Sequence, residues 1–181
     1  MKIHYTNISG CIVIEPTIHK DSRGDFMETF HKTKLEEALG HQINFVQDNQ
    51  SVSHKNVLRG LHFQRGKHAQ AKLGTVVCGS ALDVVVDLRK ESPSFGKYYT
   101  VELSGENRLQ VFMPKGVAHG FLVLKDQTVF SYKCDAYYNQ ESEAGIIYND
   151  PDLGIEWGVP DSELILSDKD RALPFFKELY T

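Results

Sequence analysis

The feature that most constrains the fold of this 181-residue chain is a succession of short apolar runs. Each run is rich in β-branched or aromatic side chains and is followed by turn residues. Within the run 81–88, the side chains of Leu82, Val84, Val86 and Leu88 recur at every second position, as on one face of a β-strand. Long helices alternating with strands are missing, which argues against a Rossmann fold or a TIM barrel. The pattern predicts an all-β sandwich or barrel of antiparallel strands, with further strands at 76–79, 99–103, 109–113, 120–124 and 128–133.

A few short helices complete the prediction. Residues 33–39 are expected to form one, because Thr33 and Glu36 have the spacing of a capping box and Gly40 is a favoured C-cap. Residues 166–181 are expected to hold a short terminal helix. The chain has no internal repeat and no Pro- or Ser-rich linker, so we expect one domain over residues 1–181.

Composition argues against several classes of protein. The formal net charge is −4 and the basic residues are scattered, which disfavours non-specific binding to nucleic acid. Cys11, Cys78 and Cys134 form no CxxC pair, so a disulfide framework or structural zinc site is not expected and a reducing compartment fits. The N-terminus lacks a signal-peptide pattern, and no stretch is long and apolar enough to cross a bilayer. We therefore expect a soluble cytoplasmic protein.

His62 is the first candidate for chemistry. Strand alternation would place Gly60, His62 and Gln64 on one face, and Gly60 is typical of a bulge or of a close backbone approach. A histidine on a strand is more often a hydrogen-bonded structural residue than a catalyst. The neighbouring Arg59, a permanent cation, and the polar Gln64 favour a functional interpretation.

Other polar residues have ordinary structural interpretations when taken singly. The Pro-x-Gly-x-x-His spacing that ends at His119 is seen across small cupin-type β-barrels, but such a histidine can also simply stabilise its turn. Tyr132 shares its predicted strand face with Phe130, and most such tyrosines are core residues. Arg23 and Glu28 would by default be surface charges around a turn, and residues 168–170 a solvated loop.

A set of short segments, taken together and in order, carries a more specific signal. They are residues 21–24, 47–51, 57–64, 70–73, 86–89, 92–96, 114–121, 149–151, 154–157 and 166–170. In this order they resemble the dTDP-4-dehydrorhamnose 3,5-epimerase family, and the resemblance covers nearly the whole chain.

The resemblance implies both a fold and a reaction. Members of this family are cofactor-free, metal-free cupin-type jelly rolls with a few short helices, and they are usually homodimers. They invert C3 and C5 of dTDP-4-dehydro-6-deoxy-D-glucose to give dTDP-4-dehydro-L-rhamnose, on the route to dTDP-L-rhamnose. Both carbons flank the C4 ketone, so loss of either proton gives an enolate. The reaction needs a base, an acid on the opposite face and a group that holds the enolate oxygen.

The resemblance also implies catalytic roles. It makes His62 the base, which suits a side chain that titrates near neutrality. Asp170 is implied as the carboxylate that orients this histidine, and Lys72 as the cation beside the C4 oxygen. Tyr132 is implied as the proton donor, since a phenol at its unperturbed pKa stays protonated at neutral pH.

Further residues are implied as substrate contacts. Arg23, Arg59 and Lys169 resemble diphosphate or sugar contacts, and Tyr138 an aromatic that stacks on the nucleotide base. Arg23 or Glu28 is expected to act across a dimer interface, because the family's N-terminal segment tends to reach the neighbouring site. The other implied binding positions are Glu28, Gln47, Asp48, Asn49, His119 and Glu143.

Two departures from the family pattern and three alternatives remain open. Gly74-Thr75 stands where Val-Arg is expected, and Tyr148 where tryptophan is common, which bears on substrate affinity more than on reaction type.

Relatives that epimerise only C3 or only C5 would use the same base and acid. A metal-dependent cupin is disfavoured because His62 is followed by Phe63-Gln64 and not by a His-x-His pair. A non-catalytic sugar-binding cupin would not need the acid and base together.

Overall fold

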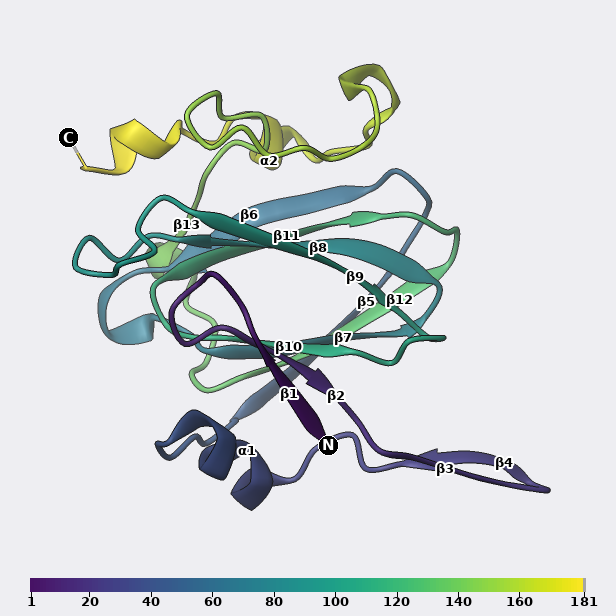
Figure 1. Ribbon diagram of the computed structural model, residues 1–181. Helices are drawn as coiled ribbons and strands as arrows, with labels where there is room; N and C mark the ends of the chain where they lie inside the picture. The colour runs from purple at the N-terminus through teal and green to yellow at the C-terminus, as the bar shows by residue number, and fades with distance from the viewer. Residues whose placement is uncertain (181) are drawn as a thin grey trace.

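The computed structural model describes residues 1–180, which form two stacked antiparallel sheets (Figure 1). One sheet has the strand order β1 (Lys2–Tyr5), β2 (Ile12–Glu15), β10 (Gln110–Met113), β7 (Lys72–Cys78), β12 (Thr128–Cys134) and β5 (Gln47–Ser53). The other has the order β13 (Glu143–Gly145), β6 (Leu58–Gln64), β11 (Val117–Val123), β8 (Ser80–Asp87) and β9 (Tyr98–Ser104). The predicted all-β, cupin-type jelly roll is confirmed.

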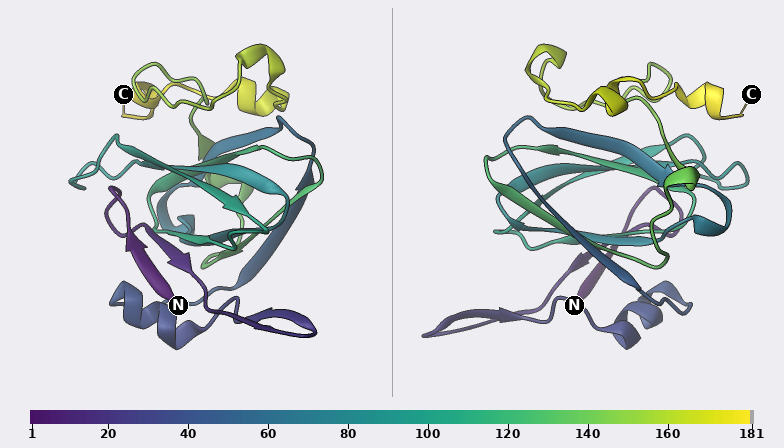
Figure 2. Two further views of the ribbon diagram at one scale, coloured as in Figure 1. Left: turned by 45° about the vertical axis from the view of Figure 1, so that its right-hand side comes forward. Right: turned by 180° about the vertical axis from the view of Figure 1, so that it is seen from behind.

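Short elements surround this sandwich (Figure 2). The hairpin of β3 (Ile18–Asp21) and β4 (Gly24–Met27) projects from the body on the side away from α1 (Lys32–Leu39). The segment after β13 lies over the outer face of the sheet that contains β6 and β11. The remaining helices are η1 (Gly66–His68), η2 (Gln140–Ser142), η3 (Asp161–Glu163), α2 (Asp168–Arg171) and η4 (Phe176–Tyr180).

Strand β8 buries both of its faces. Val85 belongs to the core between the sheets, where the rings of Phe121 and Phe130 stack with centroids 4.2 Å apart. Val84 and Val86 pack on the other side, in a cluster that includes Trp157 of the C-terminal segment. The predicted alternation is therefore present, but the C-terminal segment covers the face that would otherwise meet solvent.

The helix near the N-terminus forms where it is predicted, but with a different cap. His31, and not Thr33, is the N-cap, and its Nδ1 accepts a hydrogen bond from the backbone N–H of Lys34 at 3.4 Å. The carboxylate of Glu36 turns to the N–H of Ile43, so the predicted capping box is wrong. Gly40 ends the helix at φ +72°, as predicted. No helix in residues 1–180 is both long and apolar enough to span a membrane.

An irregularity between β6 and β11 determines what faces the site. His119 pairs with His62 and Phe121 pairs with Arg59, so β6 has one residue more than β11 between these pairs. A Cβ on Gly60 would lie 2.6 Å from the Cα of Gly120, which confirms the predicted close backbone approach. Strict alternation would point Arg59 and His62 to opposite faces. The extra residue lets both line one pocket.

Candidate active site

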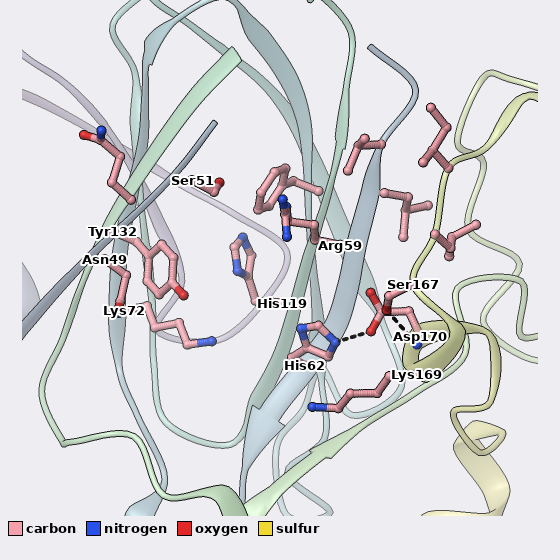
Figure 3. Close-up of a pocket in the computed structure, with 16 residues that line it drawn as sticks. Asn49, Ser51, Arg59, His62, Lys72, His119, Tyr132, Ser167, Lys169 and Asp170 are labelled. Carbon is pink, nitrogen blue, oxygen red and sulfur yellow. Dashed lines mark hydrogen bonds and ion pairs between the residues drawn. The ribbon is translucent and has the colours of Figure 1, made fainter. Parts of the chain in front are cut away.

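A pocket of about 620 Å³ opens between the two sheets and is closed on one side by residues 165–170 (Figure 3). Strands β5 and β12 contribute from one sheet, and β6 and β11 from the other. Polar side chains from distant parts of the chain therefore converge on one volume. Of the predicted site residues, those that line it are Asn49, Arg59, His62, Lys72, His119, Tyr132, Lys169 and Asp170.

His62 and Asp170 form a hydrogen-bonded pair. His62 Nε2 lies 2.6 Å from Asp170 Oδ1, and the N–H of Gly60 donates to Oδ2 at 3.5 Å. Burial by itself would raise the pKa of Asp170, but the hydrogen bond and charge of His62, with Gly60 and Ser167, hold that pKa below its usual value. An ionised Asp170 fixes Nε2 as the protonated nitrogen, and Nδ1 is then the nitrogen directed to the pocket (Figure 3).

Lys72 brings a cation into the same space. Its Nζ lies 5.7 Å from the ring centroid of Tyr132, and within residues 1–180 it has no carboxylate partner. Burial lowers the pKa of Lys72, while nearby Cys134, Asp83 and Glu143 act in the opposite direction. An ammonium group without a partner in a desolvated pocket is a strong electrostatic group for a developing anion.

Tyr132 faces His62 across the pocket. The two side chains come from β12 and β6, which belong to opposite sheets, and Lys72 projects between them in Figure 3. Burial raises the pKa of the Tyr132 phenol, Cys134 and Glu143 raise it further, and Arg59 acts against them. The phenol therefore keeps its proton over a wider range of pH than a free tyrosine.

His119 forms a second histidine–carboxylate pair, with a residue that the sequence analysis missed. Its Nε2 lies 2.7 Å from Oδ2 of Asp83, and both side chains are buried. The other oxygen, Oδ1, has no hydrogen-bond partner within the described chain. The sequence signal for this pair was Asp83 itself, an acidic residue inside the apolar run 81–88. A charge in a buried strand needs a partner.

Three more predicted contacts, Glu143, Tyr138 and Gln47, do not line the pocket but are linked by hydrogen bonds to Lys169 and Asn49, which do. Glu143 accepts hydrogen bonds from the hydroxyl of Tyr138 at 2.7 Å and from Nζ of Lys169 at 2.5 Å. Burial would raise the pKa of Glu143, but Lys169, Tyr138 and the charge of His62 lower it overall. Gln47 accepts from the N–H of Tyr138 and donates to Asn49, so these side chains form one connected edge.

The other three predicted contacts do not line the pocket of this chain either. Arg23 is in the β3–β4 hairpin and pairs with Asp21, while Glu28 pairs with Lys34 of α1. Asp48 is on β5 but does not line the pocket. A single chain thus brings the predicted catalytic residues together and leaves Arg23 and Glu28 apart from them.

Ser51 is a pocket residue that the sequence analysis did not assign. It lies on β5 opposite Phe130, and its Oγ is buried without a hydrogen-bond partner in the part of the chain that is described. Ser51 lies in residues 47–51, one of the segments that carry the resemblance to the family. That resemblance was the signal in the sequence that could have identified it.

The two departures from the family pattern lie away from the pocket lining. A Cβ on Gly74 would be 3.1 Å from side-chain atoms of Met113 and Phe130, so glycine makes room for the core there. The hydroxyl of Thr75 donates to a backbone carbonyl at 3.0 Å. Tyr148 is buried, and its hydroxyl donates to Asp161 at 3.1 Å.

The arrangement suits proton transfer next to a carbonyl. It combines a histidine held by a carboxylate, a protonated phenol on the opposite wall and, between them, an ammonium group with no carboxylate partner in the described residues. Within residues 1–180, no three His, Cys, Asp or Glu side chains are grouped in a way that could hold a metal ion.

Comparisons with known proteins agree over nearly the whole chain. Residues 5–178 match the family model described as dTDP-4-dehydrorhamnose 3,5-epimerase. The protein of that name from Escherichia coli K12 is 49% identical over 179 residues, which cover 99% of this chain and 96% of that protein. The crystal structure of the dTDP-4-dehydrorhamnose 3,5-epimerase from Elizabethkingia anophelis NUHP1 superposes with a TM-score of 0.95 at 52% identity, covering 98% of this chain and 97% of the other. A dTDP-6-deoxy-D-glucose-3,5-epimerase from Legionella pneumophila in complex with dTDP-4-keto-L-rhamnose gives a TM-score of 0.93 at 47% identity, covering 97% and 93%.

Proposed function

This chain belongs to the dTDP-4-dehydrorhamnose 3,5-epimerase family, and from that premise we propose how its residues carry out the family reaction. The chain is an isomerase that inverts C3 and C5 of dTDP-4-dehydro-6-deoxy-D-glucose. The product is dTDP-4-dehydro-L-rhamnose, a precursor in dTDP-L-rhamnose biosynthesis. The observation that carries the mechanism is the His62–Asp170 pair facing Tyr132 across one pocket.

His62 is proposed as the base. Its Nδ1 removes the proton from C3 or C5, and the electron pair of that C–H bond moves into an enolate whose charge rests on the C4 oxygen. Asp170 stabilises the imidazolium formed in this step, as a carboxylate does for a base that it orients. Lys72 is proposed to hold the enolate oxygen, because its Nζ projects between Tyr132 and His62 (Figure 3) and has no carboxylate partner within residues 1–180.

Tyr132 is proposed as the acid. It gives its phenolic proton to the carbon from the face opposite His62, so the configuration of that carbon inverts. The enolate collapses to the ketone, and solvent restores the two proton carriers. The raised pKa of Tyr132 supports this role, since the phenol must be protonated when the enolate forms.

Arg59 and Lys169 are proposed to bind the diphosphate. Both line the pocket, and Arg59 uses its Nε on Ser53, which leaves its terminal nitrogens for phosphate oxygens. Tyr138 is proposed to stack on the nucleotide base, since its ring is exposed and its hydroxyl bonds Glu143, which also accepts from the pocket residue Lys169.

We further propose that the protein works as a homodimer in which Arg23 or Glu28 reaches the neighbouring pocket. The support is their place on and just after a hairpin that projects from the body (Figure 2) and that contributes no residue to the lining of their own pocket. Mixing two inactive variants, Arg23→Ala and His62→Asn, tests this. If Arg23 acts in trans, mixed dimers contain one intact site and activity returns. If mixing restores nothing while mixed dimers form, Arg23 does not act in trans.

A cytoplasmic location is also proposed. Its support is three free cysteines, of which Cys78 is exposed, as suits a reducing compartment.

One assay tests substrate and product together. The 4-keto-6-deoxyglucose nucleotide is incubated with the protein, a reductase and NADPH, and a parallel sample in D₂O is followed by NMR. We expect NADPH oxidation and deuterium at both C3 and C5. Deuterium at C3 that never appears at C5 would contradict double epimerisation.

A further inference from the structure

Helix α2 carries two pocket residues on a single turn. It spans Asp168–Arg171, and its consecutive residues Lys169 and Asp170 both line the pocket. One turn of helix is not stable by itself in water, because its nucleation cost is not repaid. The position of both side chains therefore depends on what holds the ends of this turn.

The side chain of Ser167 holds its first end. Ser167 is the N-cap, in an extended conformation, and its Oγ accepts a hydrogen bond from the backbone N–H of Asp170 at 3.1 Å. The backbone N–H of Arg171 donates to the carbonyl of Ser167 at 3.1 Å. Asp170 is thus hydrogen-bonded to Ser167 through its backbone N–H and to His62 through its carboxylate.

Just before the helix, the chain is fixed to the strand that carries His62. The N–H of Ile165 donates to the carbonyl of Asn56 at 2.9 Å, and the N–H of Leu58 donates to the carbonyl of Ile165 at 3.0 Å. These bonds place residue 165 against the start of β6. Ser167 is therefore the side-chain link between an anchored segment and the turn that carries Asp170.

We propose that Ser167 is a positioning residue for the reaction, which fixes the α2 turn so that the Asp170 carboxylate meets His62 and Lys169 meets the substrate. This inference rests on the proposed role of His62 as base. Within the described residues the Oγ of Ser167 accepts the N–H of Asp170 and makes no hydrogen bond to His62, so Ser167 acts on His62 through Asp170. Without the cap, the turn frays and the imidazolium loses part of its carboxylate contact.

Several charges face His62, and the test must separate the effect of Asp170 from theirs. Lys169 comes from the same turn as Asp170, Glu143 from β13 and Lys72 from β7. Ser167 has no hydrogen bond to any of these three. A change in the titration of His62 that follows the capping ability of residue 167 therefore reports the Asp170 contact.

The experiment compares residue 167 variants that can cap a helix with one that cannot. Ser167→Ala removes the cap, while Ser167→Thr and Ser167→Asn keep an oxygen that can accept from the N–H of Asp170. Asn107→Ala is the matched control, because Asn107 also accepts backbone N–H bonds, at 3.0 and 3.1 Å, but in the turn between β9 and β10. The readouts are kcat, the pH profile of kcat/KM, and the titration of the His62 imidazole by NMR in ligand-free protein, assigned with His62→Asn.

For Ser167→Ala we expect a loss in kcat of about fivefold to tenfold, the ratio that corresponds to losing a typical N-cap. The acidic limb of the pH profile and the His62 titration in the ligand-free protein should both move to lower pH. Threonine and asparagine should restore both, and Asn107→Ala should move neither.

Two outcomes would overturn the proposal. An unchanged His62 titration in ligand-free Ser167→Ala, together with a raised KM, would mean that the hydroxyl contacts substrate directly. A titration that stays shifted in both the threonine and the asparagine variant would mean that capping is not the cause. The ligand-free titration needs no turnover, so its result is independent of the assay that tests the proposed reaction.

Discussion

Nε2 of His62 and Oδ1 of Asp170 lie 2.6 Å apart although 108 positions separate the two residues in the sequence. The histidine is partly exposed to the pocket, with 30% of its side chain accessible, whereas the carboxylate is 6% accessible. The base is thus open to substrate while its partner is shielded from water. A shielded, charge-assisted hydrogen bond is stronger than an exposed one, so it holds the imidazole in one orientation.

Replacement of either member of this pair should stop proton transfer without removing the nucleotide site. We expect His62→Asn to abolish deuterium incorporation at C3 and C5. Asp170→Asn keeps the shape of the side chain but removes its charge, so kcat should fall by about 10²- to 10⁴-fold. Binding of dTDP, measured by calorimetry, should remain close to that of the unmodified protein. Normal turnover in His62→Asn would disprove the assignment of the base.

Lys72 should control the loss of activity at alkaline pH. Burial lowers the pKa of this ammonium group, so its charge is lost at a lower pH than the charge of a free lysine as pH rises. Tyr132 has a raised pKa, so its phenol is not the first group to deprotonate. The alkaline limb of the pH profile of kcat should therefore follow Lys72.

Two substitutions distinguish these groups. Lys72→Arg keeps the charge at all accessible pH values and should move the alkaline limb to higher pH, whereas Lys72→Met should lower kcat by about 10²- to 10³-fold. Tyr132→Phe, the comparison variant, should lower kcat but leave the position of the limb unchanged. An alkaline limb that stays in place in Lys72→Arg would show that another group sets it.

Gly60 should tolerate no side chain. Its φ is +121°, and a Cβ would lie 2.6 Å from Gly120 Cα and 2.8 Å from the carbonyl oxygen of His119. Gly60→Ala should lower the free energy of unfolding by about 3 kcal/mol or more, from backbone strain and overpacking together. The measurement is the urea midpoint at unchanged m-value.

Gly24 provides the matched control for Gly60. Its φ is +125°, but no atom of residues 1–180 of the same chain lies within 4 Å of the position that a Cβ would take. Gly24→Ala should therefore cost only the backbone strain, about 1–2 kcal/mol. If both variants lost the same free energy of unfolding, the close approach of Gly60 to β11 would not contribute to the cost of Gly60→Ala.

Local sequence patterns predicted the strands between residues 58 and 134, because each of these strands has buried side chains. The alternation in 128–133 and 99–103 corresponds to β12 and β9. The same patterns could not show that β8 is buried on both sides, because the covering segment comes from residues after 145. The capping box failed for a related reason. The N-cap depends on where the preceding chain enters the helix, and His31 occupies that place.

The site was less accessible to local reasoning than the fold. Periodicity alone would have separated Arg59 from His62, since only the irregular pairing with β11 turns both toward one pocket. The partnership of His62 with Asp170 came from the resemblance, because no local rule links positions 108 residues apart. Asp83 was missed although its charge, within an apolar strand, required a partner that proved to be His119.

Asp87 should make the fold sensitive to acid. Its buried carboxylate accepts hydrogen bonds from the guanidinium of Arg89 at 2.7 Å and from the hydroxyls of Ser92 and Ser94 at 2.6 Å. Burial raises its pKa, but these donors outweigh burial and lower the pKa from 3.8 to about 2. Because the folded pKa is depressed, the stabilisation is complete above about pH 4 and is lost as pH falls toward 2. It amounts to about 2 kcal/mol.

The difference in unfolding free energy between the unmodified protein and Asp87→Asn isolates this contribution. The difference should be largest at neutral pH and should shrink between pH 4 and 2, in urea titrations at each pH. Asp126→Asn is the control, because Asp126 is an exposed carboxylate whose pKa is lowered by the Lys55 N–H and by His54. Added salt should remove any pH-dependent difference in unfolding free energy for Asp126→Asn but should leave the difference for Asp87→Asn. Only the buried network around Asp87 is protected from screening by salt. A difference for Asp87→Asn that does not change with pH would contradict the assignment.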